Sequence, residues 1–214
     1  METKILEAVE TSKMSVCSPV KVWKFPEPGK NYILSADPCL GTETDSSNAA
    51  IEVIDAETGE QCAEFAQVVS PENLAPIIFD LAKRYNNAEV AVEVNSVGML
   101  TNKLLIHKFN YENIYRFKRL DRLQNTMTDI VGWWTDYKSK AQMEAIFRDF
   151  LGNNIGLIHS KKLLNEILFY NEDSPKPNDR FAAMMIALAV RDELLKSRAS
   201  ILKAEEKMRN RGVD

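Results

Sequence analysis

The chain contains 214 residues, 45% of them hydrophobic and 27% charged, which is typical of one soluble globular domain. A formal net charge of −4 argues against a dedicated DNA-coating protein, because such proteins gain affinity by neutralising phosphates. The three cysteines form no CxxC pair and the two histidines are far apart in the sequence, which disfavours disulfide frameworks, zinc cages and histidine-based sites and leaves carboxylates to carry any catalysis.

The first part of the chain predicts an antiparallel meander. Residues 1–20 show no clear pattern and are interpreted as a leader or linker. Short apolar runs over Tyr32–Asp37, Ala49–Asp55 and Gln61–Val68 are typical of strands, and the last two flank a turn signal at residues 57–60. Three strands with such short connections are expected to pair as neighbours.

The middle of the chain alternates between helix and strand patterns. Residues 70–85 begin with Ser-Pro-Glu, a helix-start signal, and continue with apolar residues at helical spacing. Residues 88–94 form a compact β-type run, residues 97–108 a second helical segment and residues 112–117 another strand. This order puts parallel strands beside the meander and predicts an α/β fold, with a mixed five-stranded sheet flanked by helices.

The C-terminal half is expected to be mainly helical. Residues 120–137 are polar and aromatic and are interpreted as a long loop or hairpin. Helices are predicted over Lys138–Phe150, over Ser160–Tyr170 and from near Asp179 to about Leu195. The charged remainder is interpreted as a frayed helix or tail. The predicted organisation is a leader or linker, one domain and a charged C-terminal segment, at residues 1–20, 21–195 and 196–214.

Three acidic residues stand out by their positions in these elements. Asp37 ends the first strand, Glu93 lies near the end of the strand at 88–94, and Asp179 occupies the first turn of the long helix. If the two strands are parallel neighbours, Asp37 and Glu93 lie side by side at the carboxyl ends of the strands, where open α/β sheets bind ligands. The helix would bring Asp179 to the same sheet through an apolar stripe of Ala182, Ala183, Ile186, Ala187 and Val190.

Converging carboxylates of this kind, without basic partners, point to divalent cations, because unaided they would repel one another. Mg²⁺ takes oxygen ligands, and two such ions ~3.5–4 Å apart can clamp an in-line phosphodiester displacement, one activating water and the other stabilising the leaving oxygen. Residues 103–122 carry six Lys or Arg against two acids. The candidates to hold a DNA backbone are Lys118, Arg119, Arg122, Lys138 and Lys140.

Each acid also has an ordinary structural interpretation. Asp37 precedes a proline, and Asp-Pro is a common turn pair. Asp179, together with Asn178, could cap the long helix. Glu93 is less easily explained in this way, because a Glu inside an apolar strand is costly to bury unpaired. The order of the three acids along the predicted elements is more specific than any one of them.

Four segments resemble the nuclease domain of the large terminase subunit of tailed bacteriophages. The sequence YILSADP at 32–38, followed by Gly41 and AIEV at 50–53, resembles the family's first motif, in which a strand delivers an aspartate. VEVNSVG at 92–98 is similar to the family's E-x-N-x-x-G segment and is the most specific match. NDRFAAMMIALA at 178–189 resembles the final motif, an acidic pair opening an Ala-rich helix. GWWT at 132–135 is similar to the segment that precedes the next helix.

This resemblance, which covers about residues 20–195, implies a ribonuclease-H-like fold and a Mg²⁺- or Mn²⁺-dependent endonuclease that cuts concatemeric double-stranded phage DNA during packaging. Asp37, Glu93 and Asp179 match the catalytic carboxylates, and Asp45 matches a position where some members place an accessory acid. The final motif departs from the family because Asn178 replaces the first acid of the pair. Implied partners are double-stranded DNA, the portal protein, the small terminase subunit and an upstream ATPase motor, since the chain carries no P-loop.

The expected location is the cytoplasm of the infected bacterial host, without a membrane span. No apolar run approaches the ~18–20 residues that cross a bilayer, and the first ten residues lack an apolar signal-peptide core. Three rival interpretations stay open from the sequence. They are another nuclease of the same fold, such as a junction resolvase or a transposase-type integrase, a non-catalytic domain that docks DNA or the portal, and an inactive α/β domain whose acids are solvated.

Overall fold

The computed structural model describes residues 20–42, 47–95, 97–121, 126–170 and 178–211. Almost all of the predicted leader at 1–20 therefore lies outside the described residues. So do two of the predicted site residues, Asp45 and Arg122.

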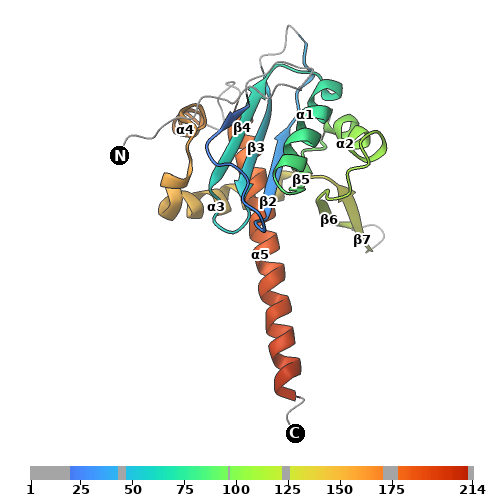
Figure 1. Ribbon diagram of the computed structural model, residues 1–214, viewed down its shortest axis with the longest axis vertical. Helices are drawn as coiled ribbons and strands as arrows, with labels where there is room; N and C mark the ends of the chain where they lie inside the picture. The colour runs from blue at the N-terminus through green and yellow to red at the C-terminus, as the bar shows by residue number, and fades with distance from the viewer. Residues whose placement is uncertain (1–19, 43–46, 96, 122–125, 171–177, 212–214) are drawn as a thin grey trace.

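A mixed five-stranded sheet forms the centre of the molecule (Figure 1). Its strand order is β1 (Lys21–Val22), β4 (Gln61–Gln67), β3 (Ala49–Asp55), β2 (Tyr32–Asp37) and β5 (Glu89–Val92). The pairs β2–β3 and β3–β4 are antiparallel, so the predicted meander is confirmed. β5 lies parallel to β2, as the alternation of helix and strand patterns predicts.

The strand predicted at residues 112–117 is wrong in its bounds, since the continuous strand begins only at Arg116. Before it, Ile114 forms one isolated parallel bridge to Val90 of β5, and Val90 exchanges backbone hydrogen bonds with Asn113 and Tyr115. The strand that follows, β6 (Arg116–Asp121), turns away and pairs with β7 (Thr126–Val131) as a separate hairpin. Its sequence RFKRLD contains four charged residues and does not suit a strand buried on both faces. The fifth strand is instead β1, at the opposite edge.

Helices cover both faces of the sheet, because the strands bury side chains on both sides. Leu34 and Ala36 of β2 belong to a core shared with α1 (Pro71–Arg84) and α2 (Gly98–His107). Ile33 points the other way, into a second core. That core is shared with α3 (Tyr137–Asn154), η1 (Ile155–Leu157), α4 (Lys161–Leu168) and α5 (Asp179–Arg211). Within the described ranges, no helix is long and apolar enough to span a membrane.

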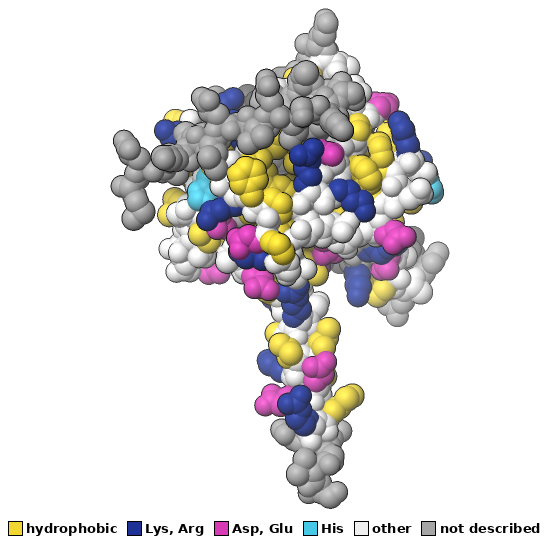
Figure 2. Space-filling view, viewed as in Figure 1, with side chains coloured by type: hydrophobic (Ala, Val, Ile, Leu, Met, Phe, Trp, Pro, Cys, Tyr) yellow, Lys and Arg dark blue, Asp and Glu magenta, His cyan; other side chains and the backbone are white. Residues whose placement is uncertain are grey.

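Helix α5 continues well past its predicted end near Leu195, as far as Arg211. Residues 183–190 are buried from end to end between the sheet and α3, which is why their apolar pattern is so dense. Beyond them the helix leaves the body of the molecule and carries charged and apolar side chains together in solvent (Figures 1 and 2). The apolar pattern fades there, but strong helix formers such as Lys, Glu, Arg and Ala maintain the helix.

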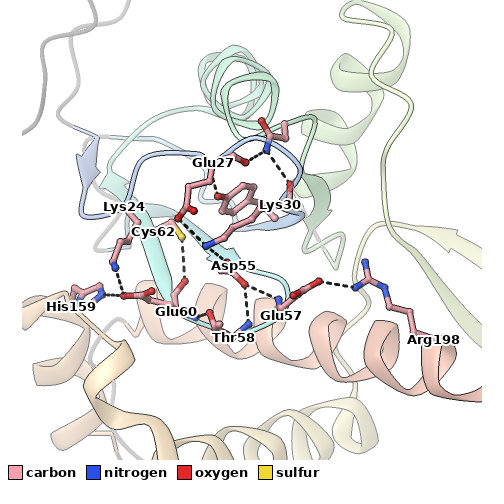
Figure 3. Close-up of polar contacts among 12 residues, drawn as sticks. Lys24, Glu27, Lys30, Asp55, Glu57, Thr58, Glu60, Cys62, His159 and Arg198 are labelled. Carbon is pink, nitrogen blue, oxygen red and sulfur yellow. Dashed lines mark hydrogen bonds and ion pairs between the residues drawn. The ribbon is translucent and has the colours of Figure 1, made fainter. Parts of the chain in front are cut away.

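The β3–β4 turn anchors α5 where the helix leaves the sheet (Figure 3). Arg191 donates a hydrogen bond to the carbonyl oxygen of Glu57, and Arg198 lies 3.7 Å from the Glu57 carboxylate. The turn itself is organised by Asp55, which accepts hydrogen bonds from the backbone N–H groups of Glu57 and Thr58 at 2.8 and 2.9 Å. This is the end of the sheet opposite Asp37, since Asp55 pairs with the first residue of β2.

Candidate functional site

Asp37 and Glu93 lie side by side at the carboxyl ends of two parallel strands. Asp37 is the last residue of β2, and Glu93 directly follows β5. The backbone N–H of Glu93 donates to the carbonyl oxygen of Ala36 at 2.8 Å, which extends the parallel pairing by one step. Since β2 and β5 are neighbours as predicted, the structure brings these two acids together.

The carboxyl group of Asp37 is in contact with that of Glu93. Burial raises the pKa of Asp37 well above its ordinary value, and the charge of Glu93, a hydrogen bond with its side chain and the charges of Asp179 and Glu166 raise that pKa further. Two carboxylates in contact cannot both stay ionised without a compensating cation. The surroundings of Asp37 therefore favour its neutral form unless a cation compensates the charge.

Asp179 reaches the same region from helix α5, of which it is the first residue. It is only 7% exposed, and its Oδ2 accepts hydrogen bonds from the backbone N–H and side-chain amide of Asn48, at 2.7 and 3.3 Å. The helix approaches the sheet closely, because Ser35 of β2 donates a hydrogen bond to the carbonyl oxygen of Ala183 at 2.6 Å. A small residue at position 183 of the predicted stripe makes this approach possible.

A cation and a fourth acid, neither predicted from the sequence, lie beside these residues. Arg180 places Nη1 2.7 Å from Glu166 in α4 and Nε 3.3 Å from Glu64 in β4. Glu166 also accepts a hydrogen bond from the backbone N–H of Phe181 at 3.0 Å, which fixes α4 against the first turn of α5. The ion pairs of Arg180 are thus with Glu166 and Glu64, two acids that were not among the predicted site residues. Arg180 adjoins Asp179 in the sequence, whereas Glu166 resembles any acid on an amphipathic helix.

The segments E-x-N-x-x-G and WWT form one structural unit. The backbone N–H of Trp133 donates to Val92, and its carbonyl oxygen accepts from Val94. Asn95 and Thr135 exchange hydrogen bonds between the Asn95 side-chain amide and the Thr135 backbone. These pairings hold the residues on both sides of Glu93 in place.

Gly98, the glycine of the E-x-N-x-x-G segment, is required because a side chain at this position would clash with its neighbours. A Cβ at Gly98 would lie 1.7 Å from the carbonyl oxygen of Glu93 and 3.2 Å from the Pro38 ring. Only a residue without a side chain allows the start of α2 to approach both acidic strand ends this closely. Gly98 therefore serves the geometry around Asp37 and Glu93 rather than a turn.

The described DNA-binding candidates are on the surface. Lys118 and Arg119 project from β6, and Lys138 and Lys140 from the first turns of α3, all of them exposed. The Arg119 guanidinium lies 5.2 Å from the centre of the Trp134 ring, a cation–π contact. These four positions remain predictions as phosphate contacts.

The carboxylate oxygen atoms of Asp37, Glu93 and Asp179 match the ligands that a hard cation prefers only in part. Asp37 and Glu93 offer oxygen atoms from two acids in contact, which is the chemistry that Mg²⁺ and Mn²⁺ prefer. Among the described residues, however, no group of three or more His, Cys, Asp or Glu side chains is gathered closely enough to hold a metal ion. The carboxylate of Asp179 accepts hydrogen bonds from Asn48 through Oδ2. The Asp37–Glu93 pair thus fits a cation, and Asp179 lies near it as a further acid.

Comparison with solved structures shows that the fold is similar to that of large terminase nuclease domains. The chain is similar to the large terminase nuclease of thermophilic phage G20c with bound magnesium, with a TM-score of 0.57 and 14% identity over 79% of this chain and 86% of that one. The same nuclease with bound cobalt gives 0.56 and 14% over 79% and 86%. The large terminase nuclease domain of Thermus phage P74-26 gives 0.51 and 12% over 80% and 83%.

No protein-family model matches the chain, and no curated protein matches it in sequence. At 12–14% identity the likeness to the solved structures concerns the fold. The predicted fold class, a mixed sheet of five strands flanked by helices in a terminase nuclease-like arrangement, is thereby confirmed.

Proposed function

We propose that this chain is a metal-dependent endonuclease that cuts double-stranded DNA. The observation that carries the proposal is the contact between Asp37 and Glu93 at the carboxyl ends of β2 and β5, with Asp179 delivered beside them by α5. A carboxyl group whose pKa is raised by burial and by a neighbouring acid is a common feature of functional sites. The terminase nuclease-like fold supports the same reaction class.

In this proposal Asp37, Glu93 and Asp179 hold Mg²⁺ or Mn²⁺, and Asp45 is an accessory ligand. Bound divalent ions activate water as a nucleophile and stabilise the charge that develops on the phosphodiester oxygens, in the two-metal manner. A bound cation would favour the ionised form of Asp37, whose pKa is raised by burial and by Glu93. Lys118, Arg119, Arg122, Lys138 and Lys140 bind the DNA backbone and position it without reading its sequence.

The proposed biological role is the cutting of concatemeric phage DNA during genome packaging in the host cytoplasm. The support for it is the fold shared with large terminase nucleases of two phages, together with the resemblance of four sequence segments. The partners in that role are the portal protein, the small terminase subunit and an ATPase motor. A junction resolvase or transposase-type activity on the same fold is the alternative nuclease, and preference for four-way junctions over plain duplex would identify it.

The test is nicking and linearisation of supercoiled plasmid in EDTA, Mg²⁺ or Mn²⁺. We expect cleavage with either metal and none in EDTA. Asp37→Asn should reduce the rate by at least about 100-fold, more than the ~10–100-fold typical of losing an outer hydrogen-bonding partner. Asp80→Asn is the matched control, since Asp80 is half-exposed on α1 and pairs with Arg84. Failure of every metal to support cleavage by the parent would favour the docking domain.

A further inference from the structure

Asn48 makes the direct contact between the start of β3 and the first residue of α5. It is the residue before β3, and it contacts Asp179, which lies 131 positions further along the chain. Its backbone N–H donates to Asp179 Oδ2 at 2.7 Å and its side-chain amide to the same oxygen at 3.3 Å. Two donors converging on one oxygen fix the direction of a carboxylate better than either donor alone.

The surrounding fold explains why this contact falls at the acidic end of the sheet. Asp37 pairs with Ala50 in the antiparallel ladder of β2 and β3, so Asn48 lies two residues beyond Asp37's partner, at the same edge. Helix α5 is held against β2 by the hydrogen bond from Ser35 to Ala183. The Asn48–Asp179 contact therefore bridges the helix and the sheet edge at which Asp37 and Glu93 lie.

We infer that Asn48 is a positioning residue for Asp179, which it directs toward the Asp37–Glu93 pair as a ligand of the divalent cation. This inference rests on the proposed function. Acidic ligands of metal ions are themselves commonly hydrogen-bonded, and loss of such an outer partner typically weakens metal binding ~10–100-fold. Asn suits the role because its amide donates to an ionised carboxylate, whereas Asp at this position would repel it.

The first experiment measures the stabilisation of the folded chain by Mg²⁺, using thermal unfolding over a range of Mg²⁺ concentrations. Asn48→Ala keeps the backbone hydrogen bond and loses the amide. We expect it to raise the Mg²⁺ concentration for half-maximal stabilisation by about 10-fold. Asn48→Ser, with a shorter donor, should recover part of the loss. Asn113→Ala is the matched control, since the Asn113 amide donates to the carbonyl oxygen of Asn87 on the surface; its midpoint should equal that of the parent.

The second experiment tests the contact itself in EDTA, where metal plays no part. Asn48→Asp should lower the unfolding temperature by placing two carboxylates together, and the further change Asp179→Asn should restore it. Plasmid cleavage by Asn48→Ala should show the same 10-fold shift in Mg²⁺ requirement, with a rate at saturating Mg²⁺ within about 3-fold of the parent, as expected for a loss of binding rather than of chemistry.

The outcomes separate this inference from the proposed function. If Mg²⁺ stabilises the parent and the Mg²⁺ concentration for half-maximal stabilisation is the same for Asn48→Ala, Asn48 does not position Asp179. The proposed nuclease function would still stand. If Asp179→Asn does not restore the unfolding temperature of the Asn48→Asp variant, the contact between residues 48 and 179 is absent in solution. A parent with neither a Mg²⁺ midpoint nor cleavage would overturn both the nuclease and the positioning role.

Discussion

Two aspartates at opposite ends of the β2–β3 pair are in opposite electrostatic situations. Burial raises the pKa of Asp55, but hydrogen bonds from the Thr58 and Glu57 backbone N–H groups outweigh it, and the net effect is a lowered pKa. Asp37 is surrounded differently. Burial and the neighbouring carboxyl group of Glu93 both raise its pKa, well above the ordinary range.

The comparison shows how neighbouring groups stabilise the charge of Asp55, an acid at the end of a strand. Asp55 has N–H donors within 2.9 Å and Lys30 at 3.6 Å, so its charge is stabilised where it stands (Figure 3). Asp37 has another acid instead, an arrangement that costs stability unless a cation joins it. Both are half-buried or buried aspartates in one sheet, so the difference lies in the partners and not in burial alone. This difference in partners supports the assignment of the proposed metal site to the Asp37 end of the sheet.

The largest expected effect comes from crowding the acidic end with Gly98→Ala. The new Cβ would lie 1.7 Å from the Glu93 carbonyl oxygen, so either α2 or the end of β5 has to move. We expect a loss of about 3 kcal/mol in the free energy of unfolding, at the upper end of the usual cost of overpacking, measured by urea denaturation.

The control for this prediction is Gly152→Ala, because a Cβ at Gly152 of helix α3 meets nothing within 4 Å. Alanine also favours a helix interior over glycine by roughly 1 kcal/mol, so this change should be neutral or stabilising. Equal stability of the Gly98→Ala chain and the parent would mean that the tight approach of α2 to Glu93 is absent in solution.

Asp37→Asn should stabilise the metal-free protein, because it removes one of two carboxyl groups in contact. In EDTA at neutral pH we expect a gain of about 2 kcal/mol, the scale of relieving a poorly solvated buried polar group. The pKa of Asp37 is raised in the folded state, so its cost is absent below the unfolded pKa and grows as the pH rises toward the folded pKa. The gain should therefore vanish near pH 4 and grow toward neutral pH.

Thermal unfolding of parent and Asp37→Asn across this pH range, with and without Mg²⁺, checks the prediction. Mg²⁺ should stabilise the parent and have little effect on the variant, reversing their order of stability. If Asp37→Asn is less stable than the parent in EDTA at neutral pH, Asp37 is a structural acid like Asp55. The proposed difference between the two ends of the sheet would then be wrong.

Much of this architecture could be predicted from the sequence, because the elements that form the acidic end have strong local patterns. The strand Tyr32–Asp37 was predicted with its observed bounds, since an apolar run ends at Asp-Pro. The parallel neighbour carrying Glu93 followed from the alternation of helices and strands. The start of α5 at Asp179 followed from its Ala-rich stripe.

The rest depended on contacts that the sequence does not encode locally. The contact of Asn48 with Asp179 spans 131 positions, and Glu166 reaches Arg180 only because α4 packs on the first turn of α5. The bounds predicted for the strand at 112–117 were wrong because the continuous strand begins at Arg116 and pairs with β7. The apolar period, which ends near Leu195, also underestimated α5, whose outer turns depend on strong helix formers.

The smallest effect is expected at the structural end, from Asp55→Asn. The amide oxygen still accepts from the Glu57 and Thr58 N–H groups, but the charge facing Lys30 at 3.6 Å is lost. We expect a loss of about 1 kcal/mol at neutral pH, the scale of one charge-assisted hydrogen bond. The pKa of Asp55 is lowered in the folded state, so this contribution is present above the unfolded pKa and is lost as the pH falls through the folded pKa.

Denaturation of Asp55→Asn and the parent from neutral to strongly acidic pH measures this difference, which should disappear in acid. That trend is opposite in sign to the one expected for Asp37→Asn, and plasmid cleavage by Asp55→Asn should match the parent at every Mg²⁺ concentration. If Asp55→Asn instead shifted the Mg²⁺ requirement, the two ends of the sheet would be coupled through β2 and β3. The assignment of function to the Asp37 end alone would then be wrong.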